Sequence, residues 1–191
     1  MRLRRVIEAA RSCTRCPAME GRARVLGEGN GSSEARCLVV AEAPGRFGAD
    51  KTGIPLHGDR TGENFERLLA DSGVRRRDLF ITNAILCSPR DEQGGGRKPA
   101  RAELANCQSH LVALIECLDP VIVVTLGATA LEAAGAIERH GLTLKWDVGD
   151  LHRWHGRFVL PLYHPGTRAM IQRPWADQRR DWKQLGTLLG G

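Results

Sequence analysis

The sequence predicts an α/β fold in three layers, α/β/α, around a central four-stranded, mainly parallel sheet. Two observations carry this prediction: short apolar runs recur along the chain, and segments of helical character separate them. Strands that alternate with helices form a parallel sheet whose two faces are covered by those helices. The chain has 191 residues, of which 42% are hydrophobic, which suits one core, so we expect a single domain over residues 1–191.

The four expected strands are continuous apolar runs, as buried parallel strands usually are. They lie at residues 37–41 (CLVVA), 79–84 (LFITNA), 121–127 (VIVVTLG) and 157–165 (RFVLPLYHP). Ligand sites of such sheets lie beyond the carboxyl ends of the strands. We therefore expect the functional residues in the loops that follow Ala41, Asn83 and Tyr163.

The expected helices are recognised by their start and stop signals. Gly73 ends a helix that begins at Glu63, and Pro99 suits the first turn of a long helix that reaches Cys117. The other helices are expected at residues 2–10, 128–136 and 177–189.

Three segments have no clear helical or strand pattern. Residues 41–62 form a loop that is too long and too rich in glycine to be a simple connector. Residues 88–98 are expected to form a flexible loop, and residues 146–154 irregular or hairpin structure.

Charge and hydropathy narrow the function classes. The formal net charge of +6 favours a polyanionic partner such as nucleic acid, although such a charge can also serve solubility alone. No apolar run is long enough to span a membrane, and the basic N-terminus lacks the apolar stretch of a signal peptide. We expect a cytoplasmic protein that does not associate with membranes.

Six cysteines without a signal peptide favour metal or cluster ligation over a disulfide framework. Cys13 and Cys16 form a C-x2-C turn, which lets two thiolates bind one metal centre. With Cys87 and Cys107 they would supply four thiolates, enough for a [4Fe–4S] cluster or for zinc. Burial as small apolar residues is the alternative for the second pair, and it is the expected state of the remaining two, Cys37 and Cys117.

Five short motifs occur in order along the chain. They are residues 41–45 (AEAPG), 50–62 (DKTGIPLHGDRTG), 82–90 (TNAILCSPR), 125–131 (TLGATAL) and 163–166 (YHPG). Together with the cysteine layout they resemble the family 4 and family 5 uracil-DNA glycosylases, over about residues 10 to 185. The resemblance implies a monofunctional DNA glycosylase that hydrolyses the N-glycosidic bond of uracil or a related deaminated base. It also implies a [4Fe–4S] cluster on the four cysteines of the two pairs.

Two positions depart from the family pattern. Leu56 stands where family 4 usually has an aromatic ring that stacks on the flipped base, and Gly166 replaces a serine. Placement between the two families is mixed, because Glu42 resembles family 4 whereas the spacing from Arg46 to Gly53 is closer to family 5. The departures leave open a glycosylase for a bulkier modified pyrimidine or a deaminated purine. A non-catalytic cluster or zinc protein that binds nucleic acid is the alternative from another class.

The resemblance and the chemistry of glycosidic cleavage suggest roles for site residues. His164 is expected to donate a hydrogen bond to the base O2 as negative charge develops there. Asn83 can accept from uracil N3–H and donate to O4, a pattern that cytosine does not match. The carboxylates expected to hold the attacking water are Asp50, Glu42 and Asp59, although any of them can instead cap a turn.

The remaining expected contacts are with the base and with the DNA backbone. The base is expected to lie against Phe47, Leu56, Ala43 and Gly45. The run after His164 is expected to contact DNA through Arg168, Met170 and Arg173, with Met170 or its neighbour Ile171 as a wedge, although an ordinary exposed loop is the alternative. We expect the partner to be DNA that contains uracil or another damaged base, and the protein to be a monomer.

Overall fold

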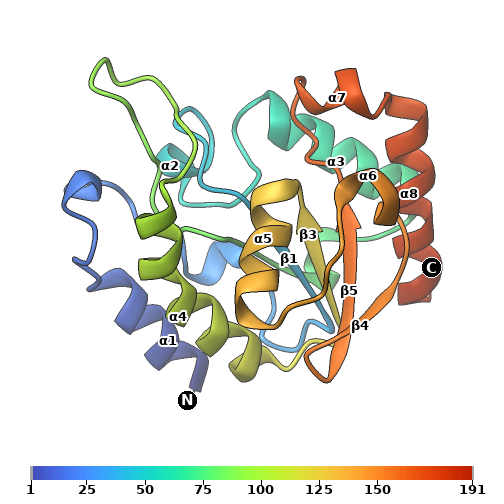
Figure 1. Ribbon diagram of the computed structural model, residues 1–191, viewed down its shortest axis with the longest axis horizontal. Coiled ribbons are helices and arrows are strands. Elements are labelled where there is room, and N and C mark those ends of the chain that lie inside the picture. The colour runs from blue at the N-terminus through green and yellow to red at the C-terminus, as the bar shows by residue number, and fades with distance from the viewer. Residues whose placement is uncertain (1, 191) are drawn as a thin grey trace.

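The computed structural model describes residues 2–190 and confirms the three-layer α/β/α fold (Figure 1). Its sheet has five strands in the order β2-β1-β3-β5-β4. The strands are β1 (Cys37–Ala41), β2 (Leu79–Asn83), β3 (Ile122–Leu126), β4 (His152–Trp154) and β5 (Arg157–Leu162). All pairings are parallel except the one between β4 and β5.

The strand β4 is one more than the sequence predicts. It lies in the segment 146–154, for which a hairpin was one of the two expectations, and it pairs with β5 in antiparallel register. Its three residues are too few and too polar to show an apolar pattern. The strand forms because the outer edge of β5 would otherwise expose unpaired backbone groups.

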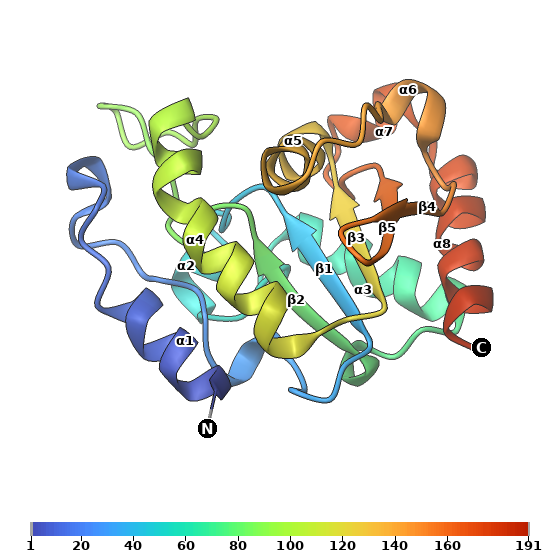
Figure 2. The same ribbon diagram turned by 60° about the horizontal axis from the view of Figure 1, so that its bottom comes forward.

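Helices cover both faces of the sheet (Figure 2). One face carries α1 (Arg2–Arg11), α4 (Arg101–Leu118) and α5 (Ala128–Ile137), and the other carries α3 (Arg60–Ser72) and α8 (Trp175–Leu189). Three helices of one turn, α2 (Ala49–Thr52), α6 (Leu144–Asp147) and α7 (Ala169–Gln172), lie in the connections.

Alternation along the strands divides the core into two parts. In β1, Leu38 and Val40 pack under α4 and α5, whereas Cys37, Val39 and Ala41 pack under α3 and α8. Successive side chains of a strand point to opposite faces, so an apolar run of five residues supplies both parts. The continuous burial of β1, β2 and β3 follows from this arrangement.

Three helices begin at other residues than expected, and a side-chain cap explains the start of α3. The helix α3 begins at Arg60, three residues before the expected start, since the Asp59 carboxylate accepts from the Gly62 N–H at 3.0 Å. The helix α4 begins at Arg101, so Pro99 lies just before it. The helix α8 begins at Trp175.

The segment 88–98 forms a short hairpin. An isolated bridge pairs Arg90 with Gly96, and the Asp91 N–H donates to the Gly95 carbonyl at 2.9 Å. Across the described part of the chain, no helix is both long enough and apolar enough to cross a membrane.

The packing of α8 on α3 depends on Gly186. A Cβ at this position would lie 2.1 Å from the Ser72 carbonyl oxygen, at the end of α3. In an exposed helix, a Gly→Ala change stabilises by roughly 0.5–1 kcal/mol. Here we expect the clash to dominate, so Gly186→Ala should lower the free energy of unfolding by about 1–3 kcal/mol.

Urea unfolding of Gly186→Ala would measure this loss. Gln184→Ala, at an exposed position of the same helix, is the matched control and should stay within about 0.5 kcal/mol of the wild type. A Gly186→Ala protein as stable as the wild type would show that the helices do not approach this closely.

Candidate active site

A small cavity of about 60 Å³ lies beyond the carboxyl ends of the parallel strands. Nine residues line it: Ala43, Gly45, Ala49, Leu56, His57, Asp59, Thr61, Asn83 and His164. Six of these are among the residues predicted from the sequence. Ala49, His57 and Thr61 were not predicted, although all three lie in or next to the glycine-rich loop that was singled out. Larger hollows, of about 670 and 800 Å³, lie at the amino ends of the strands and beside α1, and neither is lined by these groups.

His164 follows β5 and is held in one tautomer. Its Nδ1 accepts a hydrogen bond from the Gly166 N–H at 3.1 Å, so the proton of the neutral ring lies on Nε2. The loop that follows His164 is fixed as well, because buried Asn64 on α3 donates to the Pro165 carbonyl at 2.9 Å. A Cβ at Gly166 would lie 2.9 Å from Nδ1, so the serine expected there by resemblance would press on this ring.

The surroundings of His164 favour its uncharged form. Burial lowers the pKa of the imidazole below its ordinary value, and the carboxylates of Glu42 and Asp59 oppose this only in part. The ring is therefore a neutral hydrogen-bond donor near pH 7. Such a donor stabilises a developing anion without requiring a proton to be taken up first.

Asn83 supplies a second polar group to the cavity. It ends β2, its side chain is buried, and its Nδ2 has no hydrogen-bond partner among residues 2–190. A buried amide left unpaired costs roughly 1–3 kcal/mol, so such groups occur mainly where a ligand completes them. The backbone beside it is fixed, since Ala84 N–H donates to the Ala41 carbonyl at 2.7 Å.

The three candidate carboxylates have different environments. Asp59 lines the cavity and also caps α3, and a Cβ at Gly45 would lie only 2.8 Å from its Oδ2. Glu42 follows β1 and accepts a hydrogen bond from the Thr129 hydroxyl in the first turn of α5. Glu42 does not line the cavity, but it acts electrostatically on His164.

Asp50 lies on α2, directly after the cavity-lining Ala49, and does not itself line the cavity. One of its oxygens, Oδ2, accepts from the Arg90 guanidinium. The other, Oδ1, is buried and accepts no hydrogen bond from the described residues. Asp50 therefore presents one free acceptor oxygen whose position is fixed by the ion pair.

The two predicted wall residues, Phe47 and Leu56, differ in placement. Leu56 is buried and forms part of the wall, with a backbone φ of 49° that is unusual outside glycine. Phe47 is 59% exposed and lies outside the cavity, with the Arg46 guanidinium 4.1 Å from its ring centroid. Phe47 does not line the cavity, because its ring faces solvent beside the cationic side chains of Arg46 and Lys51, and its contact with the base stays a prediction.

The predicted DNA contacts lie in and around α7. Arg168 is exposed, and Met170 is half-buried beside Ile171, which is 84% exposed. Arg173 is less available than expected, because its guanidinium makes two hydrogen bonds of 2.9 and 2.6 Å to Asp181. These bonds also raise its pKa. The exposed side chains that remain for DNA contact around α7 are the apolar Ile171 and the basic Arg168.

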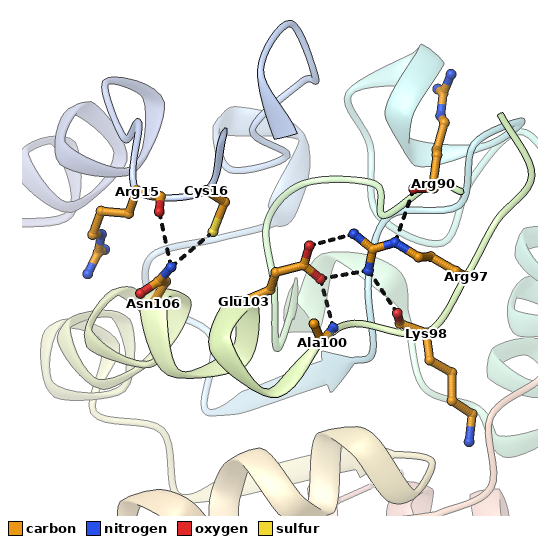
Figure 3. A network of polar contacts seen from close by, with 8 residues as sticks. All are labelled: Arg15, Cys16, Arg90, Arg97, Lys98, Ala100, Glu103 and Asn106. Carbon is orange, nitrogen blue, oxygen red and sulfur yellow. Dashed lines mark hydrogen bonds and ion pairs between the residues drawn. The ribbon is translucent and has the colours of Figure 1, made fainter. Parts of the chain in front are cut away.

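The two predicted cysteine pairs converge in space. Burial, together with the neighbouring thiols of Cys107, Cys16 and Cys13, raises the pKa of the Cys87 thiol to about 11. Hydrogen-bond donors lie beside the first pair. Arg15 Nε is 3.4 Å from Cys13 Sγ. Asn106 Nδ2 is 3.4 Å from Cys16 Sγ (Figure 3). Within residues 2–190, no three His, Cys, Asp or Glu side chains are grouped as the ligands of a single metal ion.

The other two cysteines are separate from this group. Cys37 is fully buried in β1, and burial raises the pKa of its thiol to about 12. Cys117 lies near the end of α4 beside α1. Cys37 therefore behaves as a small apolar residue, as expected.

The depressed pKa of His164 gives stability a specific pH dependence. Below about pH 6.5, the ordinary histidine value, the unfolded chain takes up a proton before the folded protein does. The free energy of unfolding should therefore decrease as the pH falls through this range, and the part due to His164 should be absent in His164→Gln. Urea unfolding between about pH 7.5 and 5 would compare the slopes, with His57→Gln at an exposed position as the control. Equal slopes in wild type and His164→Gln would contradict the neutral state of the half-buried imidazole.

Comparison with known proteins gives consistent matches. Residues 28–185 match the uracil DNA glycosylase superfamily. A type-4 uracil-DNA glycosylase of Thermotoga maritima is 36% identical, over 84% of this chain and 79% of that protein. A type-4 uracil-DNA glycosylase of Archaeoglobus fulgidus is 30% identical, over 97% of this chain and 92% of that protein. A type-5 uracil-DNA glycosylase of Pyrobaculum aerophilum is 30% identical, over 71% of this chain and 63% of that protein. The sequence match and the α/β/α fold agree, and the chain belongs to the uracil DNA glycosylase superfamily.

Proposed function

We propose that this protein hydrolyses the N-glycosidic bond of uracil in DNA and leaves an abasic site. The observation that carries the proposal is the cavity in which a neutral His164 and an unpartnered, buried Asn83 amide lie together. The names of the relatives, type-4 and type-5 uracil-DNA glycosylase, support the same substrate. The net charge of +6 suits a DNA partner.

The base is read after it leaves the stack and enters the cavity. The Asn83 amide accepts from uracil N3–H with its oxygen and donates to O4 with the Nδ2 that lacks a protein partner. Nε2–H of His164 donates to O2, where negative charge accumulates as the bond to the sugar breaks. The free Oδ1 of Asp50 orients the attacking water, and the charges of Glu42 and Asp59 stabilise the sugar cation.

The dimensions of the site favour uracil over a larger base. The cavity of about 60 Å³ is lined by Leu56, in the loop that leads into α3, and by Thr61, in the first turn of α3. A Cβ at Gly62 would lie 2.8 Å from the Leu56 carbonyl oxygen, so this loop already packs tightly on the helix. These contacts speak against the bulkier modified pyrimidine or deaminated purine that Leu56 and Gly166 leave open.

A lyase step is not part of the proposal. Strand cleavage through a Schiff base requires a lysine amine at the sugar. The lysine of the site loop, Lys51, is exposed on α2, and its ammonium is 5.4 Å from the Phe47 ring centroid. The protein is therefore expected to be monofunctional.

We also propose that Cys13, Cys16, Cys87 and Cys107 hold a [4Fe–4S] cluster. The mutual electrostatic effect of the four thiols and the donors Arg15 and Asn106 beside two sulfurs support this set. Cluster thiolates are stabilised by such hydrogen bonds. The bound cluster would link the segment after α1, the loop after β2 and the helix α4, which is a structural role. We further propose that residues 1–191 form a single domain and that the protein is a cytoplasmic monomer.

The first test is release of uracil from DNA. A uracil-containing oligonucleotide should be cut only after alkali, and a covalent adduct trapped by borohydride would contradict the monofunctional assignment.

His164→Ala should lower the single-turnover rate about 100- to 1000-fold with DNA affinity nearly unchanged, because the donor acts on transition-state charge. Near-normal rates in His164→Ala would place the reaction elsewhere.

The carboxylates should separate in the same assay. Asp50→Asn should lose at least about 100-fold in rate as the water-holding group. Asp59→Asn should lose less rate but roughly 1 kcal/mol of stability, because Asp59 caps α3. A larger rate loss in Asp59→Asn than in Asp50→Asn would exchange these roles.

The cluster has its own test. Protein purified without oxygen should be brown and hold about four iron atoms per chain. Cys87→Ser should lose the colour and fold poorly, whereas Cys117→Ser, outside the proposed ligand set, should keep both iron and solubility. A colourless wild type that binds one zinc would exclude the cluster.

A further inference from the structure

A continuous polar network joins the hairpin after β2 to the helix α4 (Figure 3). Arg97 Nε donates to the Arg90 carbonyl at 3.0 Å. The two terminal nitrogens of the same guanidinium bind the Glu103 carboxylate in a fork, at 2.8 and 2.5 Å. One side chain therefore fixes the backbone of Arg90 relative to the first turn of α4.

The α4 end of this network also contacts the cysteine group. Glu103 is only 7% exposed, and its carboxylate accepts the Ala100 N–H at 2.7 Å in addition to the Arg97 fork. One turn further along, Asn106 donates to the Arg15 carbonyl at 3.0 Å and to Cys16 Sγ at 3.4 Å. The next residue, Cys107, belongs to the four-thiol group. Two consecutive turns of α4 thus hold both the hairpin and the cysteine-bearing segment.

The other end of the network reaches the candidate active site. The Arg90 guanidinium pairs with Asp50 Oδ2, and the Asp50 side chain is only 8% exposed. A second connection runs in parallel, because Arg46, directly after the motif at residues 41–45, donates to the Gly94 carbonyl at 2.8 Å. The Arg90 guanidinium therefore fixes the position of the Asp50 carboxylate. The backbone of Arg90 is in turn fixed by the hydrogen bond from Arg97 to its carbonyl.

We propose that Arg97 is a positioning residue that connects the cysteine group on α4 to the Asp50 carboxylate through Glu103 and Arg90. The proposal rests on the proposed function, in which Asp50 orients the attacking water. Arg97 acts only through its contacts, since its guanidinium binds Glu103 and the Arg90 carbonyl simultaneously. A lysine keeps the charge but lacks the planar fork, so it cannot satisfy both partners in this geometry.

The test compares single-turnover rates of Arg97→Lys in two backgrounds. In the wild-type background we expect a loss of about 10- to 100-fold with DNA affinity unchanged, as for a small misplacement of a catalytic group. In the Asp50→Asn background, Arg97→Lys should cause little further loss, because both changes act on the same carboxylate. Iron content and thermal unfolding are measured for every variant.

Arg157→Lys is the matched control for loss of a half-buried arginine. Arg157 is 13% exposed and donates to the His155 and Ile115 carbonyls at 3.0 and 3.3 Å, at the start of β5 and away from the cavity. This variant should lose stability but keep the wild-type rate. A rate loss equal to that of Arg97→Lys would mean that any destabilised arginine gives the effect, which would overturn the proposal.

Four further outcomes are decisive. A normal rate in Arg97→Lys, or losses that multiply fully with Asp50→Asn, would overturn the proposal while leaving the glycosylase assignment intact. A normal rate in Asp50→Asn alone would instead remove the proposed role of Asp50. If Arg97→Lys binds less iron, the deciding variant is Arg90→Lys, because this change leaves the Arg97–Glu103 pair in place. Arg90→Lys must then reproduce the rate loss at full iron content. A normal rate in Arg90→Lys would overturn the proposal.

Discussion

The parallel register of the central strands is the constraint on which the rest of the molecule depends. Ala41 lies opposite Asn83, and Leu126 lies opposite Leu162, so the chain leaves each of these strands at the same edge of the sheet. Residues that are more than 100 positions apart in sequence then meet in one small cavity. The crossovers that parallel pairing requires contain the helices α3, α4 and α5, and α1 and α8 complete the two covering layers.

The candidate site combines fixed groups with groups left unpaired. His164 is fixed by a backbone N–H and by its loop, and Asp50 is fixed by Arg90. In contrast, the Asn83 amide and one Asp50 oxygen are buried without a hydrogen bond from the described residues. Such groups reduce the stability of the folded protein, and they are tolerated where a ligand or water completes them. Burial also keeps His164 neutral, which fits a donor rather than a counter-ion.

The hairpin after β2 is connected both to the cysteine group and to the candidate site. The hairpin begins just after Cys87 and contains Arg90, whose side chain reaches Asp50. The helix α4 fixes this hairpin through Glu103 and contacts the cysteine-bearing segment through Asn106. An element that resembles a flexible connector in sequence therefore has both ends fixed by buried polar contacts, and its rigidity depends on them.

The sequence by itself determined the α/β/α class, four of the five strands and the identity of most cavity residues. Continuous apolar runs and glycine-rich loops are local signals, and parallel strands bring their carboxyl ends together by necessity. Only the tertiary structure decided the remainder. Phe47 faces solvent rather than the cavity, Arg173 is bound by Asp181, and Arg97 and Glu103 form a pair that no motif indicates. These outcomes depend on which side chains meet across the fold, and pairing of that kind leaves no periodic pattern in the sequence.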